Sequence, residues 1–368
     1  MIFNQIILYV MSVCIILGAF DYSRGNKWGL GKPFEDGLNS FGALFIMMGG
    51  VLAIAPLVQV FLAPIVTPVF KVVGIDPGVF PGMVLANDSG AYFLAQAMAE
   101  NPLAADFGGM LLGSVMGVNL IFNIPVALGM IPEQDRGDMA LGFLFGFIAL
   151  PVGCFLGALA ARLPFGFLMR QMIPVIIISV LIGVLLILIP KQLIKIFVWL
   201  GKIVTILALG GIVLAVVAKL SGFDHKLQLD KVDNCIAIVG SVVIVLPGAY
   251  VLVAILSRSL RKLLAGIGNC LGINESAVLG IISSFANTIP TFALVKDMDR
   301  KGKVINFAIA TSSSFAFADQ LAFCVGVAPR LLLPMLVTKL SGALAAALLV
   351  LFYYAYKRKH ASSTTIEN

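Results

Sequence analysis

Charged residues are scarce in this chain of 368 residues, in which Asp, Glu, Lys and Arg together make up 12%. A soluble domain carries about a quarter charged residues, so the composition argues against a soluble protein. The net charge of +7 is scattered between hydrophobic runs and forms no basic stripe. We therefore expect no nucleic-acid partner, and we attribute the excess of positive charge to cytoplasmic loops.

The sequence also lacks the short motifs that mark many enzymes. It contains no Walker A sequence, no HExxH and no GxSxG nucleophile elbow, so we do not expect ATP-driven pumping or an enzyme. The five cysteines are spread singly, without a CxxC pair, and most of them lie in apolar segments. This pattern is typical of small buried hydrophobic side chains, so we expect no metal and no cofactor.

Long hydrophobic runs dominate what the sequence does contain. Hydrophobic residues make up 60% of the chain, and the mean hydropathy is +1.05. Runs such as 41–64 and 172–190 approach or exceed the ~20 residues that cross a bilayer. The N-terminal run lacks a basic start, which predicts a membrane span rather than a signal peptide. Nine full crossings are predicted, at about 2–20, 40–62, 108–131, 139–162, 173–190, 198–219, 234–256, 303–328 and 334–356.

Two further apolar segments, 74–98 and 272–295, are interrupted by polar residues, glycine and proline. Basic residues cluster in 257–262, in 296–303 and in the C-terminal tail, and such clusters mark the cytoplasmic side of a membrane. The clusters share one side if each interrupted segment is a re-entrant hairpin that enters and leaves on the same face. We predict that topology, with the N-terminus outside and a cytoplasmic tail at 357–368.

The two interrupted segments resemble each other. Gly74 and Gly272 are 198 positions apart, as are Gly82 and Gly280. The acidic stretch 99–106 follows the first segment and is predicted outside, whereas the basic stretch after the second is predicted inside. Repeats of opposite topology are typical of secondary transporters, although chance similarity between glycine-rich runs is an alternative.

We predict an all-α polytopic membrane protein of about nine to eleven transmembrane elements in two inverted repeats, each with a broken helix or re-entrant hairpin. The predicted regions are 1–162, a linking helix at 163–197, and 198–356.

A polar tetrad, Asn-Asp-Ser-Gly, lies inside the apolar run VLANDSGAYFL at 84–94. Gly90 and Pro81 predict a helix break there, and Pro290 predicts one in the second segment. Broken helices expose backbone groups that survive at membrane depth only in protein or beside a wet cavity. We predict that the two breaks meet at the midplane and form one substrate site. The candidate residues are Asn87, Asp88, Ser89, Asn119, Asn123, Asn287, Thr288, Asp319 and Gln320.

The two acidic candidates, Asp88 and Asp319, have no basic residue nearby in the sequence. Carboxylates inside a membrane need a partner, so we expect a cationic cargo. Three alternatives stay open. Asp88 would cap a half-helix or face the mouth of its hairpin, Asp319 would be satisfied by neighbouring serines, and Asn119 with Asn123 would provide interhelical hydrogen bonds.

The whole chain resembles the ethanolamine permease family of bacterial ethanolamine-utilization operons. The stretches that carry the resemblance are PGMVLANDSGAYFLAQAMAENPLAADFGGMLLGSVMG at 81–117, IPEQDRGDMALGFLFGF at 131–147 and SSFANTIPTFALVKDMDRKGKVINFAIATSSSFAFADQ at 283–320. The resemblance implies uptake of ethanolamine by a multi-pass protein of the bacterial inner membrane, with the lipid bilayer as its surroundings. At 274–275 and 285–287, the chain is more distantly similar to concentrative nucleoside transporters.

Several functions are compatible with this sequence. We expect an alternating-access permease in which the hairpin-bearing helices move against a scaffold. The alternatives are a channel-like facilitator, a transporter of another polar solute such as a nucleoside, and a membrane scaffold or receptor without flux. The sequence also leaves open a homo-oligomer.

Overall fold

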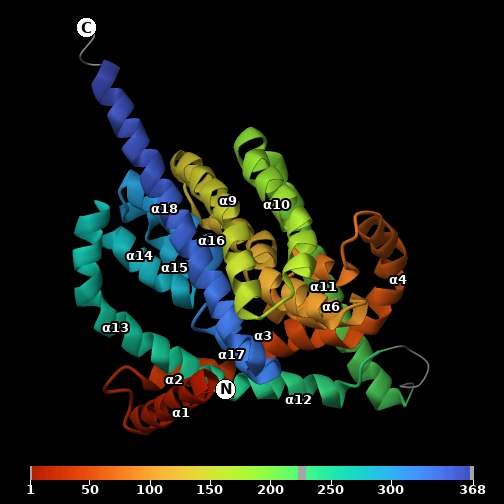
Figure 1. Ribbon diagram of the computed structural model, residues 1–368. Helices are drawn as coiled ribbons and strands as arrows, with labels where there is room; N and C mark the ends of the chain where they lie inside the picture. Colours follow the sequence, from red (N-terminus) through yellow and green to blue (C-terminus); the bar gives the residue numbers. More distant parts are fainter. Residues whose placement is uncertain (1, 223–228, 365–368) are drawn as a thin grey trace.

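A computed structural model describes residues 2–222 and 229–364 of the chain (Figure 1). Every regular element in these two ranges is a helix, which confirms the all-α prediction. Eight helical stretches in the described ranges are long and apolar enough to cross a membrane, and they coincide with eight of the nine predicted crossings. Their main helices are α1 (Ile2–Ser23), α4 (Gly50–Val72), η4 (Asp106–Gly117), α9 (Arg136–Ala160), α10 (Phe165–Leu188), α11 (Pro190–Ser221), α12 (Val232–Val243) with α13 (Leu246–Leu271), and α18 (Leu332–Thr364).

Shorter elements extend or join these helices. Two of them, η1 (Phe45–Gly49) and η5 (Asn119–Asn123), are π-helical like the longer η4, a winding that is often found at functional sites. The short element η3 (Asn87–Ala91) is a kink in which Ser89 and Gly90 are not helical. Other short elements are α2 (Gly31–Asn39), α3 (Phe41–Leu44), α7 (Pro102–Ala105), α8 (Ile124–Met130), η6 (Glu133–Asp135), η7 (Val295–Asp297) and η8 (Pro329–Leu331).

The ninth predicted crossing, 303–328, is not one continuous helix. It consists of α16 (Arg300–Ser313) and α17 (Asp319–Val327), and Phe315 between them has a left-handed φ of 60°. The backbone N–H groups of Phe315 and Phe317 donate to the carbonyls of Ser284 and Phe285, at 3.2 and 3.0 Å. Pairing with a neighbouring helix therefore satisfies the unwound chain where hydrocarbon could not.

The first interrupted segment contains η2 (Pro77–Val79), α5 (Phe80–Val84), η3 and α6 (Tyr92–Met98). Its helix breaks where Ala86 is extended and Gly90 has a φ of 99°. The second segment contains α14 (Glu275–Ala286) and α15 (Thr288–Ala293), which meet at the extended residue Asn287. Both segments are therefore broken at the predicted tetrad and its counterpart.

Each broken segment is closed at its base by a carboxylate. Asp76 accepts a hydrogen bond from the backbone N–H of Asn101 at 2.8 Å, and Asp299 accepts one from the N–H of Asn274, also at 2.8 Å. The two ends of each segment therefore lie side by side, as a hairpin requires. The inverted-repeat relation and the boundaries 1–162, 163–197 and 198–356 remain predictions.

Close backbone contacts hold the first hairpin against η4. A side chain at Gly82 would meet the carbonyl oxygen of Gly108 at 1.7 Å, and one at Gly117 would meet that of Leu85 at 1.8 Å. Glycine is the residue that permits such approach. The hairpin that carries the polar tetrad is thus packed directly on the π-helix.

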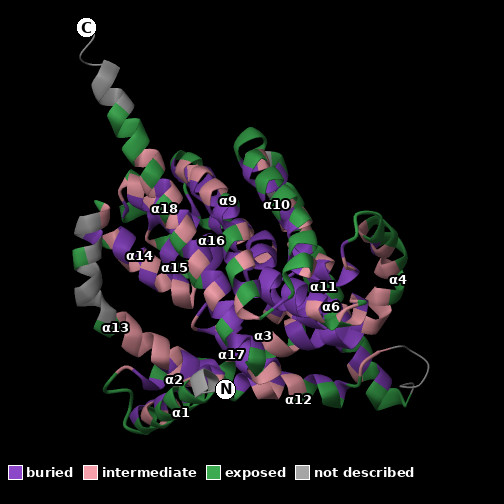
Figure 2. Cartoon of the chain, viewed as in Figure 1, coloured by how far each residue is buried: buried purple, intermediate pink, exposed green. Residues whose placement is uncertain are grey.

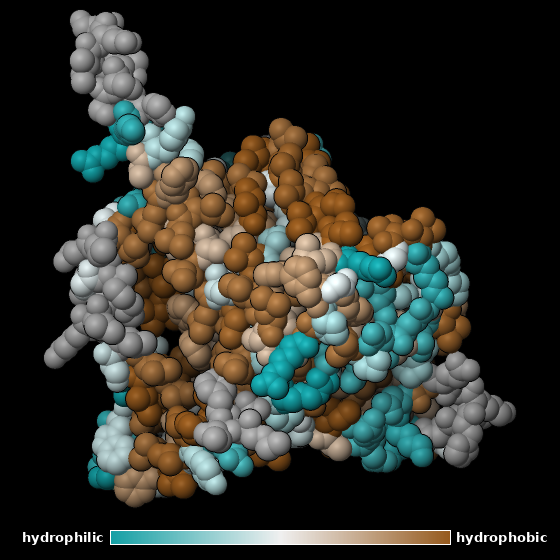
Figure 3. All heavy atoms as spheres, viewed as in Figure 1, coloured by the Kyte–Doolittle hydropathy of each residue, from teal (hydrophilic) through white to brown (hydrophobic). Residues whose placement is uncertain are grey.

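Much of the outside of the molecule is apolar, and its centre is densely packed. Figure 2 shows buried residues around α16, α17 and α6, whereas α10 and α4 turn exposed residues outward. Those exposed residues include large hydrophobic side chains such as Ile177 and Leu181 on α10 and Phe61 and Ile65 on α4. Hydrophobic atoms cover the region of α9 and α10 in Figure 3. A lipid-facing surface explains this pattern.

Candidate functional site

A cavity of about 420 Å³ lies where the broken helices meet. Four of the nine predicted site residues line it: Asp88 and Ser89 from the first hairpin, Asn287 from the second, and Asp319 from the start of α17. The breaks therefore bring both predicted carboxylates to one cavity. The other lining residues are Met47, Ala86, Val118, Ile121, Phe122, Gly201, Val204, Thr205, Ile289 and Phe315.

The two carboxylates have different surroundings. Asp319 accepts a hydrogen bond from the hydroxyl of Tyr250 at 2.5 Å, so a tyrosine and not a neighbouring serine satisfies one of its oxygens. Asp88 accepts a longer bond from the Ser89 hydroxyl at 3.3 Å. Within the described residues, neither carboxylate is in an ion pair with a lysine or arginine. The cavity thus presents two acidic groups that are available to a cation.

Asn119, Asn123 and Thr288 are fully buried and do not line the cavity. The Asn123 amide donates to the side chain of Asn119 and to the hydroxyl of Ser314, both at 2.9 Å, and its oxygen accepts from Thr288 at 2.9 Å. The Asn119 amide also donates to the carbonyl of Thr311 at 2.6 Å. This network fastens η5 to the second hairpin and to the end of α16, which is the role of interhelical hydrogen bonds.

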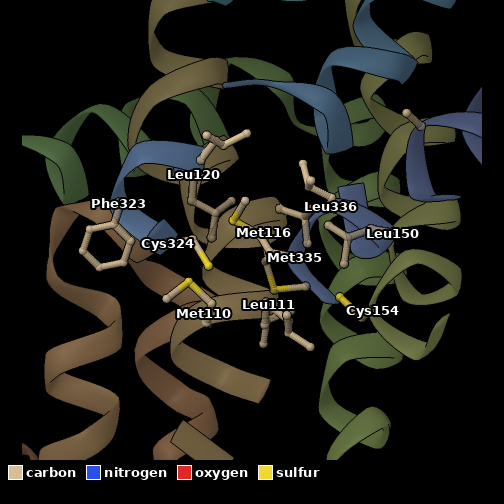
Figure 4. Close-up of a cluster of buried hydrophobic side chains, with 14 of the residues drawn as sticks. Met110, Leu111, Met116, Leu120, Leu150, Cys154, Phe323, Cys324, Met335 and Leu336 are labelled. Atoms are coloured by element: carbon tan, nitrogen blue, oxygen red, sulfur yellow. The ribbon is translucent and has the colours of Figure 1, made fainter. Parts of the chain in front are cut away.

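Asn87 and Gln320 each adjoin a cavity carboxylate in sequence, but both are fully buried behind the lining. The Asn87 amide faces the sulfurs of Met110 and Met335 at 3.5 and 3.9 Å. Both methionines belong to the buried hydrophobic cluster drawn in Figure 4. Among the described residues, the Asn87 oxygen and both polar atoms of Gln320 have no hydrogen-bond partner. Buried polar atoms without partners are costly and call for an explanation, such as bound water or a polar ligand.

Lys339 is the main residue of this region that the candidate set omits. It lies on α18, is 0% exposed, and interacts electrostatically with the Asp88 carboxylate. Its ammonium donates to the carbonyl oxygens of Ser114, Ser314 and Ser312 at 2.7, 2.8 and 3.3 Å. Asp88 therefore does have a basic group in its surroundings, supplied by the far end of the chain. A signal was present, because Lys339 is the one charged residue in the predicted crossing 334–356.

Comparison with known proteins is consistent with this architecture. Residues 3–353 match the family described as "Ethanolamine utilisation protein, EutH". The chain is 40% identical to "Probable ethanolamine permease EutH" of Listeria monocytogenes, covering 93% of this chain and 92% of that protein. It is 36% identical to the Escherichia coli protein of the same name, covering 93% of each, and 35% identical to "Uncharacterized protein YxeR" of Bacillus subtilis, covering 94% of this chain and 93% of that protein. No solved structure matches the chain. This multi-pass protein of the bacterial inner membrane therefore belongs to the EutH family of membrane permeases.

Proposed function

We propose that this protein takes up ethanolamine in its protonated form and binds it in the cavity between the two hairpins and α17. The observation that carries the proposal is that Asp88 and Asp319 line one cavity without a paired lysine or arginine in the described chain. A monovalent ammonium supplies the missing countercharge, because an intramembrane carboxylate requires a partner. The names of the Listeria and E. coli relatives support the same substrate.

The lining of the cavity suits a small amino alcohol. The ammonium lies between the two carboxylates, and the ring of Phe315 adds a cation–π attraction of roughly 0.5–2 kcal/mol. The substrate hydroxyl has three polar neighbours available in the lining, namely Asn287, Ser89 and Thr205. The apolar remainder of the wall limits competition from water.

The ion pairs that join the two halves of the chain support a carrier. Arg330 donates to Asp106 at 2.7 Å, and Lys303 donates to Asp135 at 2.6 Å. Each pair joins a residue of 1–162 to one of 198–356, and the predicted topology puts the first pair outside and the second inside. In the proposed alternating-access cycle, one pair breaks while the other is intact.

Uptake of radiolabelled ethanolamine by proteoliposomes tests the substrate and the site together. We expect Asp88→Asn and Asp319→Asn to weaken apparent affinity by roughly 10- to 100-fold, since a hydrogen bond to a charged group is worth about 1.5–3 kcal/mol. Asp233→Asn is the matched control, because Asp233 is 71% exposed and does not line the cavity. Wild-type rates in both cavity variants would refute the site, and absence of wild-type uptake under every gradient would refute the function.

Counterflow separates the carrier from a channel-like facilitator. Proteoliposomes loaded with unlabelled ethanolamine should accumulate labelled substrate transiently above its equilibrium level, because unlabelled substrate inside competes with the labelled substrate for exit on the carrier. A channel gives no such overshoot. Competition by nucleosides tests the other solute class, and we expect none at concentrations that saturate ethanolamine uptake.

A further inference from the structure

Two of the carbonyl oxygens around Lys339, those of Ser312 and Ser314, are unusual because no following helical turn uses them. The helix α16 ends at Ser313, and the N–H groups that would serve Ser312 and Ser314 donate elsewhere. The N–H of Ala316 donates to Ser313 at 3.1 Å, and that of Ala318 donates to Phe315 at 3.3 Å. The unwinding at Phe315 therefore leaves two carbonyl oxygens without a backbone donor among the described residues, and Lys339 donates to both. Ser114 on η4 contributes the third.

Three convergent main-chain oxygens form the kind of site that holds a monovalent cation. Broken helix ends and unwound carbonyls coordinate sodium in many secondary transporters, and rings of carbonyls replace the hydration shell of potassium in channels. Here the Lys339 ammonium occupies that position, and its three N–H groups match three acceptors. An ammonium is a compact point charge on a flexible stem, so it serves as a tethered cation.

The charged side chains in and around the cavity determine how many cations can be balanced there. In their ionised forms, Asp88 and Asp319 contribute two negative charges, and Lys339 contributes one positive charge. The neighbouring pair Asp106 and Arg330 is neutral as a unit. One negative charge therefore remains, which a single monovalent cation balances.

We infer that Lys339 is an internal cation: it fills a monovalent-cation site made of three carbonyl oxygens and thereby limits the cavity to one further cation, the substrate. The identity of that further cation rests on the proposed function. It follows that the wild-type protein needs no sodium or potassium for uptake. A protein without the Lys339 ammonium has a vacant carbonyl site and one additional negative charge, so it should bind an inorganic monovalent cation.

Two measurements on Lys339→Met test this inference. The first is thermal unfolding of the purified full-length protein in sodium, potassium or N-methylglucamine chloride, without ethanolamine. We expect sodium or potassium to raise the Tm of the variant but not that of the wild type, since a ligand stabilises the state that binds it. The second is ethanolamine uptake, which should fall roughly tenfold or more in the variant when N-methylglucamine replaces both ions, because a buried charge is then uncompensated. Lys219→Met, at an exposed surface pair, is the matched control.

The outcomes separate this inference from the proposed function. Wild-type uptake that requires sodium or potassium would overturn the inference. A folded Lys339→Met protein whose Tm and uptake rate are the same with and without sodium or potassium would also overturn it. Absence of ethanolamine uptake by the wild type would refute the function alone, because the Tm measurement contains no ethanolamine. If Lys339→Met does not fold in any salt, the double variant Asp88→Asn with Lys339→Met tests the inference in its place. The double variant restores the net charge, so its uptake should be independent of both ions, and a requirement for either ion would overturn the inference.

Discussion

Gly117→Ala is predicted to disturb the site through the backbone alone. The new methyl group would lie 1.8 Å from the carbonyl oxygen of Leu85, whereas ordinary contacts begin at 3.4 Å, so the chain must separate by about 1.6 Å. No side-chain rotation relieves a clash with main-chain atoms. Leu85 immediately precedes the break that positions Asp88, so the carboxylate must shift with it. Overpacking of a tight core costs about 1–3 kcal/mol or more.

The assay combines stability and transport in the purified protein. We expect a lower Tm for Gly117→Ala and a loss of ethanolamine uptake of roughly 100-fold, the cost of an ångström-scale misplacement of a reacting or binding group. Gly129→Ala is the matched control, because it lies on α8 with nothing within 4 Å of the added methyl group. The control should be neutral or slightly stabilised, since alanine favours helix. A Gly117→Ala protein with wild-type Tm and uptake would show that the hairpin is not packed on η4 as described.

Three further predictions concern the network, the cavity wall and the ion pairs. Asn123→Ala should lower the free energy of unfolding by about 1–3 kcal/mol, because it leaves the buried partners Asn119, Thr288 and Ser314 short of hydrogen bonds; denaturation that matches wild type would contradict this. Phe315→Leu should weaken ethanolamine affinity by roughly 2- to 30-fold through loss of the cation–π attraction, and an unchanged binding isotherm would exclude that contact. Arg330→Gln should favour the outward-open state, so that a single cysteine at Thr205 in a cysteine-free background reacts roughly tenfold faster with an impermeant thiol reagent from outside. Lys303→Gln should have the opposite effect, and equal labelling of the two variants would contradict the assignment of the pairs to opposite faces.

Much of the fold could be predicted because a helix that crosses lipid must be apolar over about 20 residues, and this requirement is visible in the sequence. Spans such as 173–190 stand out because hydrocarbon tolerates few polar side chains over that length. The two breaks were also visible, since Gly90 and Pro290 are poor residues for a helix interior. The same reasoning identified Asp88 and Asp319 as cavity residues, because carboxylates rarely lie in an apolar run without a function.

The remaining features depended on tertiary contacts. The break after Ser313 contains neither glycine nor proline. It exists because the carbonyl oxygens of Ser284 and Phe285 accept hydrogen bonds from its backbone N–H groups. Asn119 and Asn123 share a helix face, but their spacing does not reveal that buried side chains, rather than a cavity, lie opposite. The acceptors of Lys339 are main-chain oxygens from distant segments, which no side-chain pattern encodes.

The carboxylates at the hairpin bases have a mechanical consequence. Asp76 and Asp299 each tie the main chain of one arm to that of the other, so the arms cannot slide along each other. In the proposed alternating-access cycle, each hairpin would therefore move as one body hinged at its base, and a small rotation there would sweep its tip through a larger arc. Asp88 and Asn287 lie at those tips. The residues that contact a solute would then be displaced together.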